Sequence, residues 1–330
     1  MNQLKDYISL VNKEINDILL QSFPEPKELY NPIEYILSNG GKRIRAVMTL
    51  IAANLFKDDI STVIAPALGI EIFHNFTLLH DDIMDKASIR RGIPTVHIKW
   101  NENAAILSGD AMMILANKMI AKAPAEVLAP VLEVFNNTAL EVCEGQQFDM
   151  NLEQKDISKT TISENDYIEM IRLKTSVLIG ASLKIGAICG GASIEQSELL
   201  YKYGINIGLA FQIQDDLLDT FGDEAEFGKR IGGDIIEGKK TYLLIKAMEN
   251  ASLEDVEIVK QTINSSNNNE SKKIETIKTI YIKSKAKEAA EAKIASYFKI
   301  AGEYLQMLQL PERKLTTILE LEASLKRRIN

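Results

Sequence analysis

The sequence of 330 residues is poor in cysteine and lacks several common catalytic signatures. Its two cysteines, Cys143 and Cys189, each lie in an apolar stretch, which predicts two buried, reduced thiols in a cytosolic protein. No His-x-x-x-His or Cys-x-x-Cys pair occurs, so a zinc site is not expected. The chain also has no Gly-x-x-x-x-Gly-Lys-Ser/Thr loop and no Gly-x-Ser-x-Gly elbow, which argues against a P-loop enzyme and a serine hydrolase.

Net positive charge and long uncharged runs are absent as well. The formal net charge of -8 argues against broad nucleic-acid binding, although a local basic pocket remains compatible with it. No uncharged run approaches the ~20 residues that span a bilayer. The first twenty residues alternate charged and apolar positions without a signal-peptide core. We therefore expect a cytoplasmic protein with no transmembrane segment and no nucleic-acid partner.

Strand patterns and domain linkers are also missing, whereas helical periodicity runs through most of the chain. Two segments, 142–148 and 185–189, resemble short strands, but their flanks favour helix. Length alone favours two domains, but a site that joins both halves would favour one. We predict an all-α, single-domain helical bundle over residues 1–330, with a central apolar cavity. The expected helices are Leu4–Leu20, Ile33–Leu37, Ile44–Leu55, Ile64–Met84, Gly109–Ala123, Val127–Met150, Asn165–Gly190, Ser193–Phe221, Tyr242–Met248, Lys283–Leu308 and Thr316–Arg328.

The feature that stands out is an acidic pentad, Asp-Asp-x-x-Asp, which occurs twice at the end of apolar helical runs. Aspartates four apart share a helix face. Two unit charges ~4 Å apart repel by ~4 kcal/mol at an effective dielectric near 20, so cations are expected among them. A solvated helix end is the alternative for one pentad, but a second copy favours a Mg²⁺ site. The carboxylates are Asp81, Asp82, Asp85, Asp215, Asp216 and Asp219.

Basic residues cluster before and after the first pentad. Lys42 and Arg45 follow Gly40-Gly41 at a predicted helix start, three residues apart and thus on one face. Cations at this end oppose the helix dipole, which indicates an anionic ligand near the free backbone N–H groups. Arg90 and Arg91 follow the pentad, either as salt-bridge partners or as forks for diphosphate oxygens.

The second half contributes fewer distinctive residues. Lys174 and Thr175 lie in a predicted helix, and Gln212 precedes the second pentad. Lys229 and Lys239 flank Gly232-Gly233-Asp234, which we interpret as a loop that can fold over the mouth of a site. Each of these residues is individually more typical of a solvent-facing position. His80 and His97 are interpreted as neutral histidines satisfied within helix packing.

Taken in order, the motifs resemble those of the trans-type polyprenyl diphosphate synthases, short-chain (geranylgeranyl or farnesyl) type. They are Gly-Gly-Lys-Arg-Ile-Arg, Asp-Asp-Ile-Met-Asp with Arg-Arg-Gly-x-Pro-Thr, Lys-Thr, Phe-Gln-Ile-Gln-Asp-Asp-Leu-Leu-Asp, Gly-Lys-Arg and Gly-Lys-Lys-Thr. The resemblance extends from about Tyr30 to about Lys246 and is specific, because several independent motifs keep order and spacing. One departure is Ala46, where many members have proline. It leaves the charged residues intact.

The resemblance implies an isoprenoid synthase fold and a Mg²⁺-dependent prenyltransferase that joins isopentenyl diphosphate to an allylic diphosphate. It implies that Asp81, Asp85 and Asp215 bind metal directly and that Asp82, Asp216 and Asp219 act through water. The allylic diphosphate would be held by Arg90, Lys174, Lys229 and Lys239, and isopentenyl diphosphate by Lys42, Arg45, His74 and Arg91. Thr175 and Gln212 would steady the allylic cation with uncharged oxygen dipoles.

The resemblance also implies a homodimer and a short product. A bulky residue five places before the first motif, here Phe76, tends to form the floor for C20 or C15 products. Thr77 lies nearer the aspartate face, so Phe76 can instead be an ordinary core aromatic. A medium- or long-chain synthase for quinone tails stays the main alternative. A class I terpene cyclase and a non-catalytic subunit fit less well, because all six carboxylates and the Lys42/Arg45 site are present.

Overall fold

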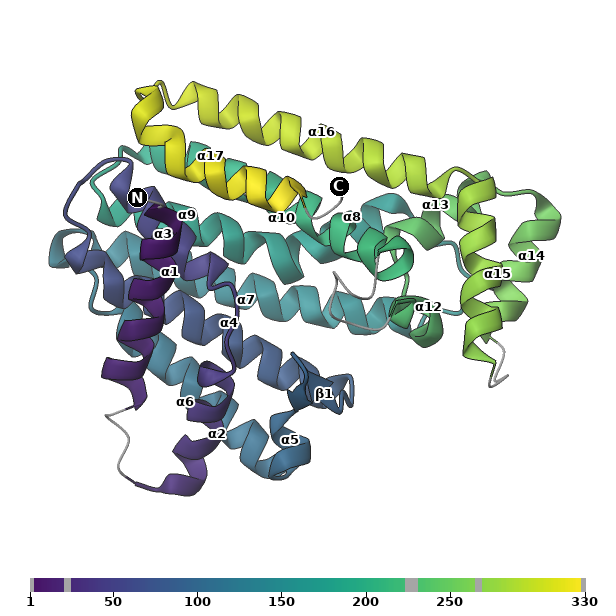
Figure 1. Cartoon of the computed structure of the whole chain (residues 1–330), viewed down its shortest axis with the longest axis horizontal. Helices are drawn as coiled ribbons and strands as arrows, with labels where there is room; N and C mark the ends of the chain where they lie inside the picture. Colours follow the sequence, from purple (N-terminus) through teal and green to yellow (C-terminus); the bar gives the residue numbers. More distant parts are fainter. Residues whose placement is uncertain (1–2, 21–24, 223–230, 265–268, 328–330) are drawn as a thin grey trace. The chain divides into compact units, whose positions relative to one another are not determined.

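The structure is a computed structural model that describes residues 3–20, 25–222, 231–264 and 269–327. Helices make up most of these residues, so the prediction of an all-α fold is confirmed (Figure 1). The strands found within these ranges are β1 (Ile89–Arg90) and β2 (Ile93–Pro94), which pair antiparallel as a short hairpin. No sequence pattern predicts this hairpin, because two residues per strand are too few for a periodic signal.

The chain divides into two compact units. Unit 1 consists of Met1–Asn137, Ala181–Tyr201 and Leu310–Leu321, and unit 2 consists of Thr138–Gly180, Lys202–Gln309 and Glu322–Asn330. The single domain expected over residues 1–330 therefore stays a prediction. The division falls inside four helices, which are α7 (Leu128–Glu153), α9 (Val177–Cys189), α10 (Ile194–Phe221) and α17 (Glu312–Lys326).

Helix α4 (Ile64–Met84) is the core helix of unit 1 and has the bounds expected from its apolar periodicity. Residues 66–73 are all buried, so the helix is covered on every side over two turns. Gly69 allows the close approach of α6 (Glu102–Ile120), because a Cβ there would lie 2.9 Å from the Ala116 carbonyl oxygen. The side chain of Asn101 caps α6 by accepting a hydrogen bond from the Ala104 N–H (2.8 Å).

By length and composition, the stretch Ser61–Met84 is also apolar enough to cross a membrane, with a mean hydropathy of 1.4. Most of this window, 61%, is buried inside the protein. Its apolar side chains are therefore largely covered by other helices. The remaining helices of unit 1 are α1 (Gln3–Glu14), the π-helical turn η1 (Ile15–Leu20), α2 (Lys27–Ser38), α3 (Ile44–Asn54), η2 (Ser61–Val63), α5 (Val96–Lys99) and η3 (Ala125–Val127).

Unit 2 is tied together by an ionic cluster. The Lys246 ammonium lies 2.5 Å from Glu164 and 2.7 Å from Glu249, and Lys293 lies 2.8 Å from the second oxygen of Glu164. This cluster joins α8, α13 and α16. The helices of unit 2, several of them on the right of Figure 1, are α8 (Glu164–Ile171), η4 (Arg172–Ser176), α12 (Gly233–Glu237), α13 (Tyr242–Asn250), α14 (Leu253–Asn264), α15 (Glu270–Lys283) and α16 (Ala286–Met307).

Three expectations are corrected by the structure. The helix expected over 165–190 is interrupted by the π-helical turn η4. The helix expected from Lys283 begins at Ala286, because Lys285 adopts a positive φ of 57°. Cys189 is buried, and burial raises the pKa of its thiol to about 12, but Cys143 is exposed on α7. The prediction of two buried thiols is therefore wrong for Cys143, whose apolar neighbours do not cover it.

Candidate active site

The first acidic pentad forms the C-terminal end of α4. Asp81 and Asp82 belong to its last turn, and Asp85 follows as the C-cap, with its N–H donating to the Asp81 carbonyl oxygen (2.9 Å). Asp85 keeps right-handed helical dihedral angles (φ -81°, ψ -5°), so it continues the turn that carries Asp81. The negative end of the helix dipole adds to these carboxylates. The pentad is therefore placed where a cation is favoured.

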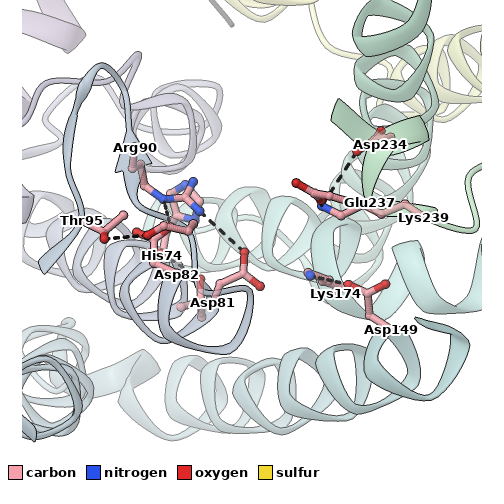
Figure 2. Close-up of polar contacts among 12 residues, drawn as sticks. His74, Asp81, Asp82, Arg90, Thr95, Asp149, Lys174, Asp234, Glu237 and Lys239 are labelled. Carbon is pink, nitrogen blue, oxygen red and sulfur yellow. Dashed lines mark hydrogen bonds and ion pairs between the residues drawn. The ribbon is translucent and has the colours of Figure 1, made fainter. Parts of the chain in front are cut away.

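Asp82 is the buried member of this pentad, with an exposed fraction of 3%. Arg90, from strand β1, donates its Nε–H to Asp82 Oδ1 (2.7 Å), and its Nη2 lies 3.7 Å from Asp81 Oδ2 (Figure 2). Burial raises the pKa of the Asp82 carboxyl, and the Arg90 cation opposes this shift. The structure thus gives Arg90 the salt-bridge role considered from sequence. Its diphosphate-binding role stays a prediction.

The basic motif is a turn before helix α3 and not its first turn. Helix α3 begins at Ile44, because Arg43 adopts a left-handed conformation with φ 50°. Gly40 and Gly41 also have positive φ, at 67° and 122°. The prediction that Lys42 and Arg45 share one helix face is therefore wrong, since Lys42 is exposed in the turn and only Arg45 is helical.

Arg45, His74 and Arg91 surround this turn. The Arg45 guanidinium lies 3.0 Å from His74 Nε2, and Arg91 donates from Nη1 to the Gly40 carbonyl oxygen (2.7 Å). A Cβ on Gly41 would lie 3.0 Å from the same Arg91 nitrogen, and the φ of 122° at Gly41 is a conformation that favours glycine. Burial, together with Arg45 and Arg91, holds the pKa of His74 well below its usual value. A neutral histidine among arginines is typical of a site for an anion.

Phe76 is part of an aromatic cluster in unit 1. Its ring centroid lies 5.6 Å from that of Phe73 and 4.8 Å from that of His80, and Phe73 contacts Phe135 at 5.4 Å. Thr77 donates its hydroxyl to the His74 carbonyl oxygen (2.8 Å). Phe73 and Phe135 are buried core residues, whereas Phe76 is half-buried. The role of Phe76 and Thr77 in product length stays a prediction.

The other two histidines differ from each other. His80 packs against α6 at Gly109, where a Cβ would lie 2.2 Å from its Nε2, and this nitrogen is 3.2 Å from the Ile106 carbonyl oxygen. The interpretation of His80 as a packing residue is therefore confirmed. His97 Nδ1 is buried without a hydrogen-bond partner in the part of the chain that the structure describes. The expectation of a fully satisfied His97 is wrong.

In unit 2, the second pentad lies near the C-terminal end of α10. Its buried member is Asp216, with an exposed fraction of 5%. The Tyr167 hydroxyl donates to Asp216 Oδ2 (2.5 Å), and the Gln212 amide donates to Oδ1 (3.2 Å). Within the described ranges, no lysine or arginine forms an ion pair with Asp216. Burial raises the pKa of Asp216 to about 7, against the effect of hydrogen bonds from Tyr167, Gln212 and the Tyr242 backbone.

The segment after the second pentad is held to α10 through Asp219. Asp219 Oδ2 accepts a hydrogen bond from the Asp234 N–H (3.0 Å), and the Gly232 N–H donates to the Asp219 carbonyl oxygen (2.6 Å). The segment was expected to be a loop, but Gly233–Glu237 forms the short helix α12. Lys239 lies 3.1 Å from Glu237 and 3.9 Å from Asp234 (Figure 2). Lys229 lies outside the described residues.

Lys174 and Thr175 lie in the π-helical turn η4, a distortion that is frequent at functional sites. Glycines on two neighbouring helices admit this turn: a Cβ on Gly145 would lie 2.2 Å from the Lys174 nitrogen, and one on Gly208 would lie 2.6 Å from the Ser176 Cα. The Lys174 ammonium binds Asp149 Oδ2 (2.6 Å; Figure 2), and Thr175 donates to Gln212 Oε1 (3.1 Å).

Several residues of these sites were missed by the sequence analysis. Tyr167 and Asp149 contact predicted site residues, but each lies far from its partner in sequence, and Asp234 was assigned to a loop without a contact to Asp219. The signal that was available is Gly145, a glycine inside a long helix, which indicates a close backbone approach. The identity of what approaches it cannot be read from spacing.

Both pentads have the hard oxygen donors that Mg²⁺ prefers, placed at helix ends where a cation offsets the dipole. Asp82 and Asp216 already accept strong hydrogen bonds, so the more accessible aspartates are the better metal ligands. Among the residues that the structure describes, no group of three or more metal-binding side chains gathers closely enough to hold an ion alone. The residues fit a magnesium site only if ligands from elsewhere, such as a substrate diphosphate, complete it.

Comparison with known proteins identifies the family. The model of the polyprenyl synthetase family matches residues 26–281. The geranylgeranyl diphosphate synthase of Methanosarcina mazei is 42% identical over 76% of each chain. The short chain isoprenyl diphosphate synthase of Methanothermobacter thermautotrophicus is 36% identical over 94% of this chain and 93% of its own. A geranylfarnesyl diphosphate synthase of Natronomonas pharaonis is 36% identical over 71% and 74%.

Solved structures agree. The crystal structure of a geranylgeranyl pyrophosphate synthase has a TM-score of 0.92 and 41% identity over 98% of both chains. Another, from Corynebacterium glutamicum and complexed with isoprenyl diphosphate and magnesium, has a TM-score of 0.83 and 26% identity over 98% of this chain and 97% of its own. The chain belongs to the polyprenyl synthetase family and has the isoprenyl synthase fold. The prediction of a short-chain prenyltransferase is confirmed, and the C20 synthases among these relatives agree with a C20 product.

Proposed function

We propose that this protein is a magnesium-dependent geranylgeranyl diphosphate synthase. It would join isopentenyl diphosphate to allylic diphosphates of C5 to C15 and release inorganic diphosphate. The observation that carries this proposal is that both acidic pentads lie at the C-terminal ends of helices, with their buried members held by Arg90 and by Tyr167 and Gln212. The alternative is a synthase of longer chains.

Isopentenyl diphosphate would be held by Lys42, Arg45, His74 and Arg91. The contact between Arg45 and His74 and the hold of Arg91 on Gly40 support a preformed anion site in unit 1. Because the pKa of His74 is depressed, its imidazole is neutral at pH 7 and does not add a further charge. Exposed Lys42 would be recruited to the diphosphate as it binds.

The allylic diphosphate would be bound through Mg²⁺, with Asp81, Asp85 and Asp215 as direct ligands and Asp82, Asp216 and Asp219 supporting them. When bound, the metal supplies Lewis-acid stabilisation of the leaving diphosphate. Arg90, Lys174, Lys229 and Lys239 would neutralise the remaining charge. This arrangement requires that the two pentads belong to one site in one domain, which is part of the proposal.

The condensation begins when the allylic diphosphate separates into a carbocation and the leaving diphosphate. The allylic C–O bond breaks, its electron pair leaves with diphosphate, and the isopentenyl double bond forms a new C–C bond at the allylic carbon. A proton is then lost, for which the departed diphosphate is a suitable base. The Thr175 hydroxyl donates a hydrogen bond to Gln212 Oε1, so its own oxygen lone pairs stay available to an allylic cation. Such a dipole would steady the cation without reacting with it.

Product length is assigned to Phe76, with Thr77 beside it, as the floor of the chain-binding region. The aromatic contacts of Phe76 with Phe73 and His80 would make that floor rigid. Phe76→Ala should then lengthen the products. An unchanged product distribution on chromatography would remove Phe76 from this role and leave the longer-chain alternative to be decided by the unmodified protein.

We also place the protein in the cytoplasm as a homodimer. Helix α6 of unit 1 exposes large apolar side chains, with exposed fractions of 60% for Leu107 and 63% for Ile114. These residues are seven apart, hence on one helix face, and a second copy of the chain would cover them. Sedimentation analysis would test this assembly.

The decisive experiment incubates the purified protein with isopentenyl diphosphate and each of the C5, C10 and C15 primers, with and without Mg²⁺. The expected product is C20 from every primer, formed only with the metal. Products well beyond C20 would support the longer-chain alternative. Cyclised hydrocarbons, or no condensation with any primer, would contradict the proposed function.

A further inference from the structure

Arg43, the middle cation of the basic motif, differs from its neighbours because it is turned into the protein. Its exposed fraction is 4%, and Nη1 lies 3.1 Å from Glu71 Oε1 on α4. Nε donates to Asn12 of α1 (3.0 Å), and Nη2 donates to the Leu37 carbonyl oxygen at the end of α2 (2.5 Å). One guanidinium therefore joins three helices of unit 1 to the start of a fourth.

This geometry leaves Arg43 unsuited to binding substrate. All three of its nitrogens are used by groups of the protein, and its partner Glu71 has an exposed fraction of 2%. Asn75 also donates to Glu71 Oε1 (3.2 Å), so this carboxylate oxygen is held from two sides. The ion pair is thus fixed in place, whereas Lys42 before it is exposed.

The backbone around Arg43 explains what the ion pair restrains. Arg43 is a non-glycine residue with φ 50°. Gly40 and Gly41, which precede Lys42 in the same turn, also have positive φ. Such a turn is unfavourable for a free chain and needs contacts that select it. Arg43 supplies these contacts from the core side, while Arg91 holds the Gly40 carbonyl oxygen from the other side.

We propose that Arg43, anchored by Glu71, is a positioning residue that fixes the Gly40–Lys42 turn so that Lys42 and Arg45 can bind the diphosphate of isopentenyl diphosphate. This inference rests on the proposed function for the identity of the substrate. It explains why a motif with three cations offers only two of them to the ligand. It also gives the buried carboxylate of Glu71 a role that the catalytic scheme does not.

The test compares Arg43→Gln, Arg43→Lys and Glu71→Gln with the unmodified full-length protein. Lys184→Gln is the control, because Lys184 is another ion-paired cation of unit 1, partly buried and paired with Glu198 on α10. For each variant, kcat and the KM values for isopentenyl and allylic diphosphate are measured. Calorimetry with inorganic diphosphate in EDTA reports binding without metal or turnover, and thermal unfolding reports the folded fraction.

Arg43→Gln and Glu71→Gln should raise the KM for isopentenyl diphosphate by about tenfold, since a small misplacement of binding groups has effects of this size or larger. The KM for the allylic substrate should stay unchanged. Arg43→Lys should recover part of the loss, because lysine keeps the ion pair but not the fork. Lys184→Gln should lower thermal stability without changing either KM.

Equal changes in both KM values, or a fall in kcat that only follows the folded fraction, would overturn the positioning role. If Arg43→Gln does not fold, Glu71→Gln and the diphosphate titration decide the question. Absence of condensation by the unmodified protein would overturn the proposed function. In that case, unchanged affinity of the variants for inorganic diphosphate would still overturn this inference separately.

Discussion

The two acidic pentads have the same sequence pattern, yet the protein surrounds their buried carboxylates differently. Asp82, in unit 1, lies 2.7 Å from the cationic Arg90. Asp216, the equivalent residue in unit 2, is held by the neutral donors Tyr167 and Gln212. Burial raises the pKa of both carboxyls, but that of Asp216 reaches about 7.

The same sequence motif therefore supplies the same carboxylates in two different electrostatic surroundings. The first pentad has the cation of Arg90 beside Asp81 and Asp82, and Arg90 is also one of the arginines that, after burial, lower the pKa of His74. The surroundings of the second are anionic, since burial and the charges of Asp216 and Asp219 hold the pKa of Asp234 well above its usual value. In the metal-free protein, binding of a cation should therefore stabilise the second pentad more than the first.

The largest expected effect comes from removing the cation of the first pentad. Arg90→Met should lower the free energy of unfolding by about 2–4 kcal/mol at pH 8, because Asp82 becomes a buried charge without a counterion. Urea unfolding in EDTA measures this change. Arg172→Met is the control, since its bidentate pair with Glu169 and its longer pair with Glu141 are both partly exposed and should contribute less than about 1 kcal/mol. Equal losses in both variants would contradict the role of Arg90.

Removing the charge of Asp216 in the second pentad should raise the stability of the protein, whereas Arg90→Met should lower it. The pKa of Asp216 is raised on folding from 3.8 to about 7, so the folded state binds the extra proton. Its favourable contribution is present below about pH 4 and is lost as the pH rises through about 7. Asp216→Asn should therefore stabilise the metal-free protein by about 1–3 kcal/mol at pH 8.

The same variant serves as its own control at lower pH. Near pH 4 the aspartate is protonated in the folded protein, so Asp216→Asn should have little effect there. Asparagine also keeps an acceptor oxygen for the Tyr167 hydroxyl. Thermal unfolding in EDTA across this pH range is the measurement. Destabilisation at pH 8 would mean that Asp216 has a cationic partner after all.

A smaller effect should come from Tyr167→Phe. It removes the side-chain donor to Asp216 Oδ2 and should cost about 1–2 kcal/mol at pH 8, because a buried oxygen loses a hydrogen bond. The loss of stability should be smaller at pH 5, because Asp216 is then protonated and neutral and its oxygen depends less on the hydrogen bond from Tyr167. Urea unfolding at the two pH values distinguishes this from a packing defect, which would be independent of pH.

The smallest expected effect concerns His74. Its pKa is lowered in the folded protein, so the unfolded chain binds more protons below its ordinary value near 6.5. Stability should therefore fall as the pH decreases below about 6.5, by about 1 kcal/mol between pH 7 and about pH 5.5. His74→Gln should remove this part of the pH dependence. An identical pH profile in wild type and variant would contradict the depressed pKa of His74, which burial and the nearby arginines cause.

Local sequence patterns predicted part of the fold and part of the candidate site. The apolar periodicity of α4 predicted both of its ends, and the position of each pentad at a helix end followed from the same pattern. The motifs themselves were specific enough to indicate the family. These features depend on residues that are near one another in sequence, which is where periodicity and spacing carry information.

The rest depends on contacts between distant segments. Tyr167 lies 49 residues from Asp216, and nothing in its neighbourhood indicates that partner. The position of Lys42 outside helix α3 follows from the conformation of Arg43, which is selected by Glu71, 28 residues away. The π-helical turn at Lys174 likewise requires Gly145 and Gly208 on neighbouring helices. Spacing cannot reveal such pairings, because they arise from packing.

The most direct test of the central claim is whether the two pentads act on one diphosphate. Mg²⁺ binding in the presence of inorganic diphosphate would be measured by calorimetry for Asp81→Ala, Asp215→Ala and the double variant. A shared site predicts that each single substitution removes nearly all of the affinity and that the double variant loses little more. Losses that simply add would mean two independent sites, and would contradict the account.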